Sequence, residues 1–362
     1  MDSEKTYTSV STASLKPGMV VAKDVYNGDT KLLNINSPLT IPVIKKIQYY
    51  FPQGFIDVLT YSLNPDQQNV EPSTGARTLQ ATEETFSKIS SDVELMMNSI
   101  TNNSKPSIKI VREISNSILD NIVEYSLALK SITLQRDMDE YLVRHCTNVA
   151  ILSTMLGKWL NLSHKEITML NYAGLLHDIG KTKLDSQILD KPGELTRKEF
   201  AEVKKHPIYS YNIVSEFPFL DDSIAQSVLM HHERIDGSGY PLGLTGDKIH
   251  KFAKIIAIAD VFDAMTSNKS YKSRKNPFEA LKIMESDFIS KLDVIYLKTF
   301  IEKMTTYYTG EMVILNNNDV AKIIKMDPNN IDRPLVMVND TFIDLKVNRE
   351  YSISDLSHGY VL

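Results

Sequence analysis

The chain has 362 residues, 42% of them hydrophobic and 23% charged, so it can bury a large core and two or three domains are expected. Its formal net charge of −5 argues against a nucleic-acid-binding surface, so we expect no nucleic-acid polymer as a partner. No apolar run reaches the roughly 18 residues of a membrane helix, and the start does not resemble a signal peptide, so we expect no membrane insertion. The single cysteine, Cys146, excludes an intrachain disulfide and favours a reducing cytoplasm.

The N-terminal segment alternates short apolar runs with turn signals. An Asn-Gly-Asp hairpin signal at 27–29 separates two apolar pairs, Thr40 can cap a short helix, and Phe55–Leu59 is strand-like. We therefore predict a small β-rich module with one helix over residues 1–62. Residues 63–81 are rich in Asn, Pro, Gln, Ser, Thr and Gly, and this composition is typical of a linker.

In residues 82–136 the apolar residues recur at helical spacing. Phe86, Ile89 and Val93 recur on one helical face, and a polar break at 102–106 separates them from a second apolar series. We predict two connecting helices that face a core. Part of this stretch could form the seam of a homodimer.

An adjacent histidine and aspartate end a helix-like segment that begins near Ser163. His177 and Asp178 offer imidazole and carboxylate side by side, which is metal-ligand chemistry, although a lone pair of this kind is more often an ordinary hydrogen-bonded pair. Gly180 is expected to end the helix in a left-handed conformation. Lys181 places a flexible ammonium where a phosphate can bind.

Further histidines and aspartates accumulate around this pair, and each is ambiguous alone. His145 lies on an apolar helix face, where a core histidine is the usual explanation. His206 stands at a helix junction, and His231 with His232 follows an apolar helix directly before a glycine-rich loop. Adjacent residues on a helix point about 100° apart, so both histidines can reach one site only near a helix end. Asp260 lies within an apolar helix, where a buried carboxylate is costly unless it is paired or binds a metal.

Together these residues are five histidines and two aspartates on five helices or helix ends, which is too many ligands for one divalent ion. They suit two metal ions a few ångströms apart, with Asp178 as the bridge. Two-metal sites recur in phosphodiester hydrolysis because they activate water and stabilise the attacking and leaving oxygens. Thiolate-free, histidine-rich ligation suits Fe, Mn or Zn better than Mg. The ligand set is His145, His177, Asp178, His206, His231, His232 and Asp260.

Five separated motifs follow one another along residues 137–308: HDIGK at 177–181, HP at 206–207, HHE at 231–233, DGSGYP at 236–241 and ADVFDAMT at 259–266. In this order they resemble the HD-GYP domain, an all-helical bacterial branch of the HD hydrolase superfamily. The resemblance implies an all-α HD-GYP domain at 137–308. With the β-rich segments on either side of it, we predict a multidomain chain in which this helical domain is flanked by small β-rich modules. The C-terminal module is a predicted β-rich appendage at 309–362. Its strand-like runs lie at 312–315, 321–324, 335–338 and 342–345.

The resemblance also implies an activity, a cofactor and roles for the residues. Family members are c-di-GMP phosphodiesterases that open the cyclic dinucleotide to pGpG and often continue to GMP, by attack of a metal-bridging hydroxide at a two-metal centre, most often of iron. By motif, one metal is held by His145, His177, Asp178 and Asp260, and the other by Asp178, His206, His231 and His232. Asp178 and Lys181 are then catalytic, and substrate contacts come from Lys181, Gly239, Tyr240, Pro241, Asp263, Lys269 and Lys272.

Two departures from the family pattern bear on these expectations. The usual Arg-Pro-Tyr-Arg run is replaced here by Lys269-Ser270-Tyr271-Lys272, which keeps the charge but loses the planar guanidinium fork. A hydrolase of another cyclic dinucleotide, such as cyclic GMP-AMP, therefore stays open. Tyr141 stands where some members have a glutamate for a third metal, so we expect two metals. A non-catalytic c-di-GMP receptor is the alternative from another class, and the full ligand set argues against it. A metal-stabilised scaffold would not explain Lys181 or the glycine-rich loop.

Overall fold

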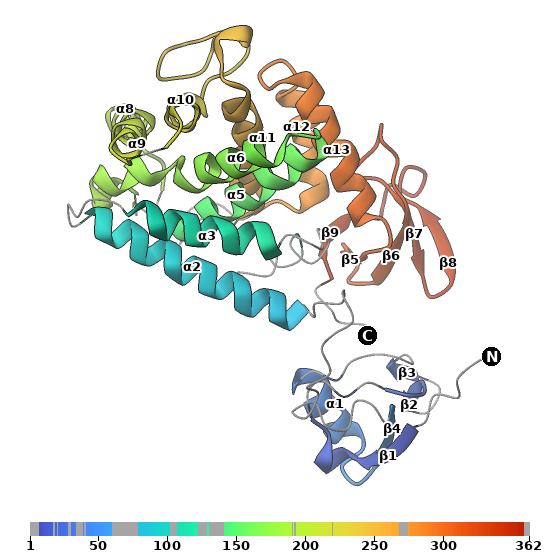
Figure 1. The fold of residues 1–362 in the computed structure, drawn as a ribbon. Helices are drawn as coiled ribbons and strands as arrows, with labels where there is room; N and C mark the ends of the chain where they lie inside the picture. Colours follow the sequence, from blue (N-terminus) through green and yellow to red (C-terminus); the bar gives the residue numbers. More distant parts are fainter. Residues whose placement is uncertain are drawn as a thin grey trace. The chain divides into compact units, whose positions relative to one another are not determined.

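The computed structural model describes residues 7–59 and 79–357, with gaps at 17–18, 20, 28–29, 34–38, 40, 102–106, 122–128, 130–140, 190, 192, 219 and 268–273. The chain divides into two compact units, one formed by residues 1–76 with 359–362 and the other by residues 77–358. Figure 1 shows their elements. Within the described residues, no helix has the length and apolar character that crossing a membrane requires.

The described residues of the first unit form two antiparallel strand pairs, one α-helix and the short 3-10 helix η1 (Thr12–Ser14). Strand β1 (Tyr7–Ser11) pairs antiparallel with β4 (Phe55–Leu59), and β2 (Val25–Asn27) pairs antiparallel with β3 (Thr30–Leu33). Gly28 and Asp29 of the predicted Asn-Gly turn lie outside the described residues. Helix α1 (Ile41–Tyr50) lies between these strands in the chain. Their apolar faces meet in a small separate core that includes Val21, Leu39, Ile44, Ile47, Ile56 and Val58.

The second unit is predominantly helical, and β-strands lie toward both ends of the whole chain, as predicted. Its helices before the metal-ligand region are α2 (Leu79–Thr101) and α3 (Ile108–Asn121). The break predicted at 102–106 lies outside the described residues. Their apolar residues, Phe86, Ile89 and Val93 among them, are buried in this unit's own core. A homodimer through residues 82–136 stays a prediction.

The centre of the unit is formed by α5 (Tyr141–Trp159), α6 (His164–Leu176) and α11 (Lys251–Thr266), which pack against one another (Figure 1). Every residue of α5 from His145 to Gly157 is buried, as expected for a helix that is surrounded by others. The remaining helices are α7 (Ser186–Leu189), α8 (Arg197–Val203), α9 (His206–Ser215), α10 (Asp222–Met230), α12 (Pro277–Asp287) and α13 (Val294–Tyr308).

Local sequence explains where these helices begin. The hydroxyl of Ser163 accepts from the backbone N–H of Glu166, whose carboxylate in turn accepts from the N–H of Ser163, so the predicted cap of α6 is a complete capping box. Thr196 and Glu199 form the same arrangement at α8. Pro207 lies in the first turn of α9, where its missing N–H leaves no helical hydrogen bond unmade.

The C-terminal strands form one antiparallel sheet in the order β8-β7-β6-β5-β9. Four strands lie where the sequence predicts them, and the fifth, β9, was not predicted. Buried sheet residues such as Val313 and Ile323 belong to the same hydrophobic cluster as the helices, so the sheet and the helical core share one compact unit. The strands are β5 (Met312–Leu315), β6 (Val320–Lys325), β7 (Leu335–Val338), β8 (Thr341–Asp344) and β9 (Ile353–Leu356).

Candidate metal centre

The His-Asp pair lies at the junction where α6 ends. Helix α6 stops at Leu176, His177 is its C-cap, and Asp178 begins the short 3-10 helix η5 (Ile179–Lys183). Both side chains are almost completely buried, His177 at 0% and Asp178 at 1% exposure. A buried histidine beside a buried carboxylate needs partners for its ring nitrogens and for the negative charge. Some of these partners are neighbours in sequence, and the others come from distant parts of the chain.

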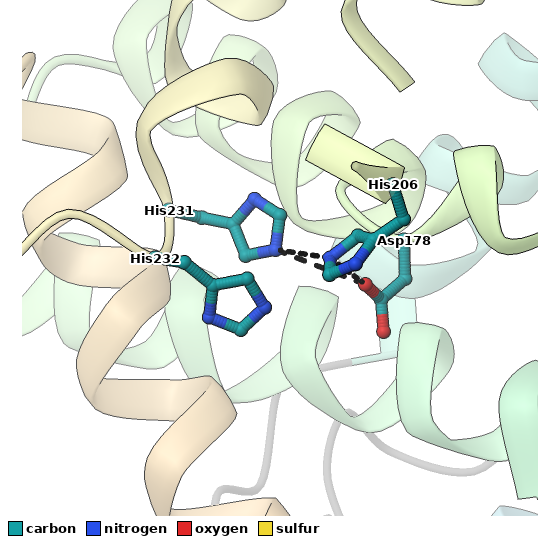
Figure 2. Close-up of side chains that lie close together, drawn as sticks. All are labelled: Asp178, His206, His231 and His232. Carbon is teal, nitrogen blue, oxygen red and sulfur yellow. Dashed lines mark hydrogen bonds and ion pairs between the residues drawn. The ribbon is translucent and has the colours of Figure 1, made fainter. Parts of the chain in front are cut away.

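The structure brings all seven predicted ligands to this place from separate elements. His145 projects from α5, His206 begins α9, His231 and His232 follow the end of α10, and Asp260 lies within α11. Helix α10 ends at Met230 and His231 is its C-cap, so the two adjacent histidines stand at a helix end and both reach the centre. Figure 2 shows them with His206 and Asp178.

The ligand atoms fall into two groups that share one residue. In each group the atoms lie within 4.8 Å of one another, and Asp178 belongs to both groups. Asp260 touches both as well, since its Oδ1 is 3.2 Å from His145 Nε2 and its Oδ2 is 3.6 Å from His232 Nδ1. The two groups are His145, His177 and Asp178, and Asp178, His206, His231 and His232.

The tautomers of three histidines are set by backbone carbonyls. In each case Nδ1 lies at hydrogen-bond distance from the carbonyl oxygen three residues earlier, and because a carbonyl only accepts, Nδ1 carries the proton. The unprotonated Nε2 of each ring therefore faces the centre, which is the usual arrangement for a metal-ligating imidazole. The three contacts are His177 to Gly174 at 2.7 Å, His206 to Val203 at 2.6 Å and His231 to Val228 at 2.6 Å.

The donor atoms of the centre fit metal cations. The Nε2 atoms of His145 and His177 face each other at 3.3 Å, and so do those of His206 and His231. His206 and His231 both carry their proton on Nδ1, so the facing lone pairs of their Nε2 atoms repel unless a cation lies between them. Asp178 Oδ1 is buried, finds no hydrogen-bond donor within the described part of the chain, and lies 3.0 Å from His206 Nε2. A buried carboxylate oxygen without a donor is satisfied by a metal ion.

Burial keeps most of these imidazoles in the neutral form that binds metals. It lowers the pKa of His177 to about 3, and it also lowers the pKa of His206 and, more strongly, that of His232. His145 differs. Burial lowers its pKa too, but hydrogen bonds to carboxylates of Asp178 and Asp260 outweigh that effect and raise its pKa well above the usual value.

Lys181 is the cation on the open side of the centre. Its Nζ lies 2.5 Å from Asp178 Oδ2, and its side chain is 19% exposed while that of Asp178 is 1% exposed. Burial works against the charge of both groups, but their mutual attraction outweighs it, so the pKa of Asp178 is lowered well below and that of Lys181 raised above its usual value. The ammonium can thus stay charged at a largely buried position.

Gly180 corrects one prediction. It is not in the left-handed conformation and does not end α6 by that means. A Cβ at this position would lie 2.3 Å from the carbonyl oxygen of His206 and 2.4 Å from the backbone nitrogen of Ser210. The N–H of Gly180 also donates to Ser210 Oγ at 2.7 Å. Glycine is therefore needed because η5 packs backbone-to-backbone against α9, which sets the spacing between Asp178 and His206.

Asp263 also differs from its prediction. It was expected at an edge that binds guanine or phosphate, but it is 0% exposed and lies behind His145. Its Oδ2 accepts from His145 Nδ1 at 2.7 Å, and its Oδ1 accepts from Asn148 Nδ2 at 2.8 Å. Asp263 lies one turn after Asp260, which explains why the sequence places it near the site but not which atoms it meets. Asn148 has no predicted role in the sequence analysis.

We expect that Asp263→Ala will lower the affinity of the protein for divalent metal by about 10- to 100-fold, because His145 loses the acceptor that fixes its tautomer and ring orientation. Titration of metal-free protein with Mn²⁺ or Zn²⁺ measures this. Asp287→Ala, at an exposed position, is the matched control. Equal affinities for the two variants would show that Asp263 does not orient the ligand.

The glycine-rich loop after His232 is held by a buried carboxylate. Glu233 is 2% exposed, and its two oxygens accept from the backbone N–H groups of Leu242 at 2.7 Å and Leu244 at 2.9 Å. Gly239 packs so closely that a Cβ would lie 2.5 Å from the Cα of Glu233. The loop was predicted from the sequence, but no role was predicted for Glu233. The signal that could have pointed to one is its place in the HHE motif, directly after two ligands.

The same loop places Tyr240 against the metal ligands. The peptide between Tyr240 and Pro241 is cis, and the Tyr240 ring centroid lies 4.7 Å from that of His232 and 6.5 Å from that of His206. Burial raises the pKa of Tyr240, so its hydroxyl stays a hydrogen-bond donor.

Of the remaining residues named in the sequence analysis, the structure describes Tyr141 but not Lys269 and Lys272. Lys269 and Lys272 lie outside the described residues, so their contacts with substrate stay predictions. Tyr141 is described, and its ring stacks on the imidazole of His145 with centroids 5.5 Å apart and planes 10° apart. An aromatic ring therefore stands beside His145 at the position where a glutamate would be needed for a third metal.

Comparison with known proteins agrees with this geometry. Residues 119–294 match the sequence model of the HD domain family. The chain is 33% identical over 229 residues to a cyclic di-GMP phosphodiesterase of Pseudomonas aeruginosa, which covers 63% of this chain and 54% of that protein. It is 36% identical over 154 residues to a 3′3′-cGAMP-specific phosphodiesterase of Vibrio cholerae, covering 42% of this chain and 33% of the relative. The chain thus spans about half the length of the Pseudomonas relative.

One solved structure supports the fold. An HDG"Y"P protein from Bdellovibrio bacteriovorus is 17% identical and has a TM-score of 0.54, over 83% of this chain and 99% of that one. The family match, the ordered motifs and the converging histidines and aspartates lead to the same assignment. Residues 119–294 thus carry the match to the HD domain family, and the motifs within them resemble those of the HD-GYP branch.

Proposed function

We propose that this protein is a metal-dependent phosphodiesterase that hydrolyses c-di-GMP to pGpG and continues to GMP. The observation that carries the proposal is that Asp178 belongs to both groups of ligand atoms, which is the arrangement a two-metal phosphodiesterase requires. Several relatives that are 33–38% identical to this chain are named cyclic di-GMP phosphodiesterases, which supports the choice of substrate.

The cofactor in this proposal is a pair of divalent metal ions, iron first and manganese or zinc as alternatives. One ion would be held by His145, His177, Asp178 and Asp260, and the other by Asp178, His206, His231 and His232. When bound, the ions would activate water for attack at phosphorus and offset negative charge on the phosphate oxygens. Neutral imidazoles and ionised carboxylates without thiolates suit these metals.

The protein residues position the substrate and balance its charge. Lys181 is placed to contact the scissile phosphate, since its ammonium adjoins Asp178 and its side chain is the partly exposed one of that pair. The carbonyl-anchored rings of His177, His206 and His231 keep the ligand geometry fixed, so little reorganisation is needed during the reaction. The single cysteine remains the basis for our prediction of a cytoplasmic location.

A second candidate substrate is 3′3′-cGAMP, because three relatives from Vibrio cholerae are named 3′3′-cGAMP-specific phosphodiesterases. The replacement of the usual arginines by Lys269 and Lys272 keeps this alternative open. The test is a comparison of kcat/KM for c-di-GMP and 3′3′-cGAMP with one preparation of enzyme. We expect c-di-GMP to be preferred by at least about tenfold. A preference for 3′3′-cGAMP would transfer the proposal to that substrate, and turnover of neither would reject it.

A further inference from the structure

The side-chain ammonium of Lys204 lies beside Tyr240, the aromatic residue of the glycine-rich loop at 236–241. Lys204 is the C-cap of α8, two residues before His206. Its Nζ lies 5.0 Å from the ring centroid of Tyr240 and 5.1 Å from that of Phe200. An ammonium over two ring faces is held in place by the negative charge of those faces while part of its hydration is lost.

The charge of Lys204 is not balanced by a carboxylate among the described residues. Two nearby lysines differ in this respect, since Lys191 pairs with Glu199 at 2.7 Å and Lys205 pairs with Glu202 at 2.6 Å. A cation that rings hold in position and that lacks a counter-ion attracts an anion to its open side.

The location of this cation is next to the open edge of the metal centre. Tyr240 lies beside both Lys204 and His232, since its ring centroid is 5.0 Å from Lys204 Nζ and 4.7 Å from the centroid of the His232 ring. The side chain of His232 is 16% exposed, whereas those of His145 and His177 are 2% and 0% exposed. The charge of Lys181 is already balanced by Asp178. Lys204 is therefore available for a second anionic group that enters beside His232.

We propose that Lys204, held by Phe200 and Tyr240, binds the phosphate of the cyclic dinucleotide that is not being cleaved. This proposal rests on the proposed function. A cyclic dinucleotide carries two phosphodiester groups, each with one negative charge. When one group lies at the metal centre, the other must lie elsewhere on the protein, and its charge favours a cation that has no counter-ion. The inference applies equally to c-di-GMP and 3′3′-cGAMP, because both have two phosphates.

The test compares Lys204→Met with Lys205→Met on substrates that have two phosphates or one. For c-di-GMP, Lys204→Met should raise KM by about tenfold while kcat changes by less than about twofold. The loss of kcat/KM should be about tenfold larger for c-di-GMP than for bis(p-nitrophenyl) phosphate, which has a single phosphate. Lys204→Arg should recover most of the affinity, because it restores the charge. Salt should raise the KM for c-di-GMP less in Lys204→Met than in the wild type.

Binding provides a readout that does not depend on turnover. The Kd of a hydrolysis-resistant bis-phosphorothioate analogue of c-di-GMP should rise by about tenfold in Lys204→Met and stay near the wild-type value in Lys205→Met. The proposal is overturned if the analogue binds Lys204→Met as tightly as wild type, or if both substrates lose kcat/KM equally. If the wild type hydrolyses no cyclic dinucleotide, the proposed function fails, and the binding comparison alone decides the role of Lys204.

Discussion

Replacing Asp178 with asparagine is expected to lower kcat for c-di-GMP by at least about 1,000-fold and to reduce the bound metal. Asp178 is the residue that both ligand groups share, and its Oδ1 lies 3.0 Å from His206 Nε2 while its Oδ2 lies 3.3 Å from His145 Nε2. An amide has no net charge and offers a single oxygen, so it cannot satisfy both groups. It also leaves Lys181 without its counter-ion.

Elemental analysis of the purified variant and a product assay on the same sample measure these effects. Asp247→Asn is the matched control, because Asp247 is exposed and its change alters charge in the same way. A variant that keeps wild-type metal content and activity would show that Asp178 does not bridge two metals. Retained metal with lost activity would limit its role to the chemical step.

Gly180→Ala is expected to lower the free energy of unfolding by about 3 kcal/mol and to weaken metal binding. The added Cβ would lie 2.3 Å from the carbonyl oxygen of His206 and 2.4 Å from the backbone nitrogen of Ser210. Both are backbone atoms, so no side-chain rotation relieves the clash. The 3-10 helix η5 and helix α9 would have to separate, which moves His206 away from Asp178.

Gly157→Ala is the control for this substitution. There the added Cβ would meet Leu170 Cδ2 at 2.7 Å, which is the end of a flexible side chain, and the expected cost is nearer about 1 kcal/mol. Urea unfolding of both variants, with and without added metal, gives the comparison. If Gly180→Ala costs no more than Gly157→Ala, the close backbone contact does not limit the packing of η5 on α9.

Most of the candidate ligands could be predicted from the sequence because they stand at a helix end or, like Asp260, put a charge into an apolar helix. His145, on an apolar helix face, has no such signal of its own. His231 and His232 are ligands of the first kind. The side chains of adjacent residues on a helix point about 100° apart, so both histidines can face the centre only near a helix end. The glycine-rich loop that follows them predicts such an end, and α10 does end at Met230. Asp260 was recognised because a lone carboxylate in an apolar helix requires a partner.

Contacts between segments that are far apart in the chain could not be predicted from the sequence. Gly180 was assigned to a left-handed turn because nothing local shows that α9 packs on it thirty residues later. Asp263 was placed on the correct face of α11, but helical periodicity gives a direction and not a depth, and its partner Asn148 lies on α5. Strand β9 was missed because Ile353 and Leu356 are its only buried residues, and it pairs with β5, far earlier in the chain.

The most direct test of a two-metal phosphodiesterase is made on protein purified without oxygen, by counting bound metal and separating the products after c-di-GMP is added to the same sample. The account predicts about two metal ions per chain and the appearance of pGpG followed by GMP. Metal and c-di-GMP both bound with no product would contradict it and identify a receptor instead.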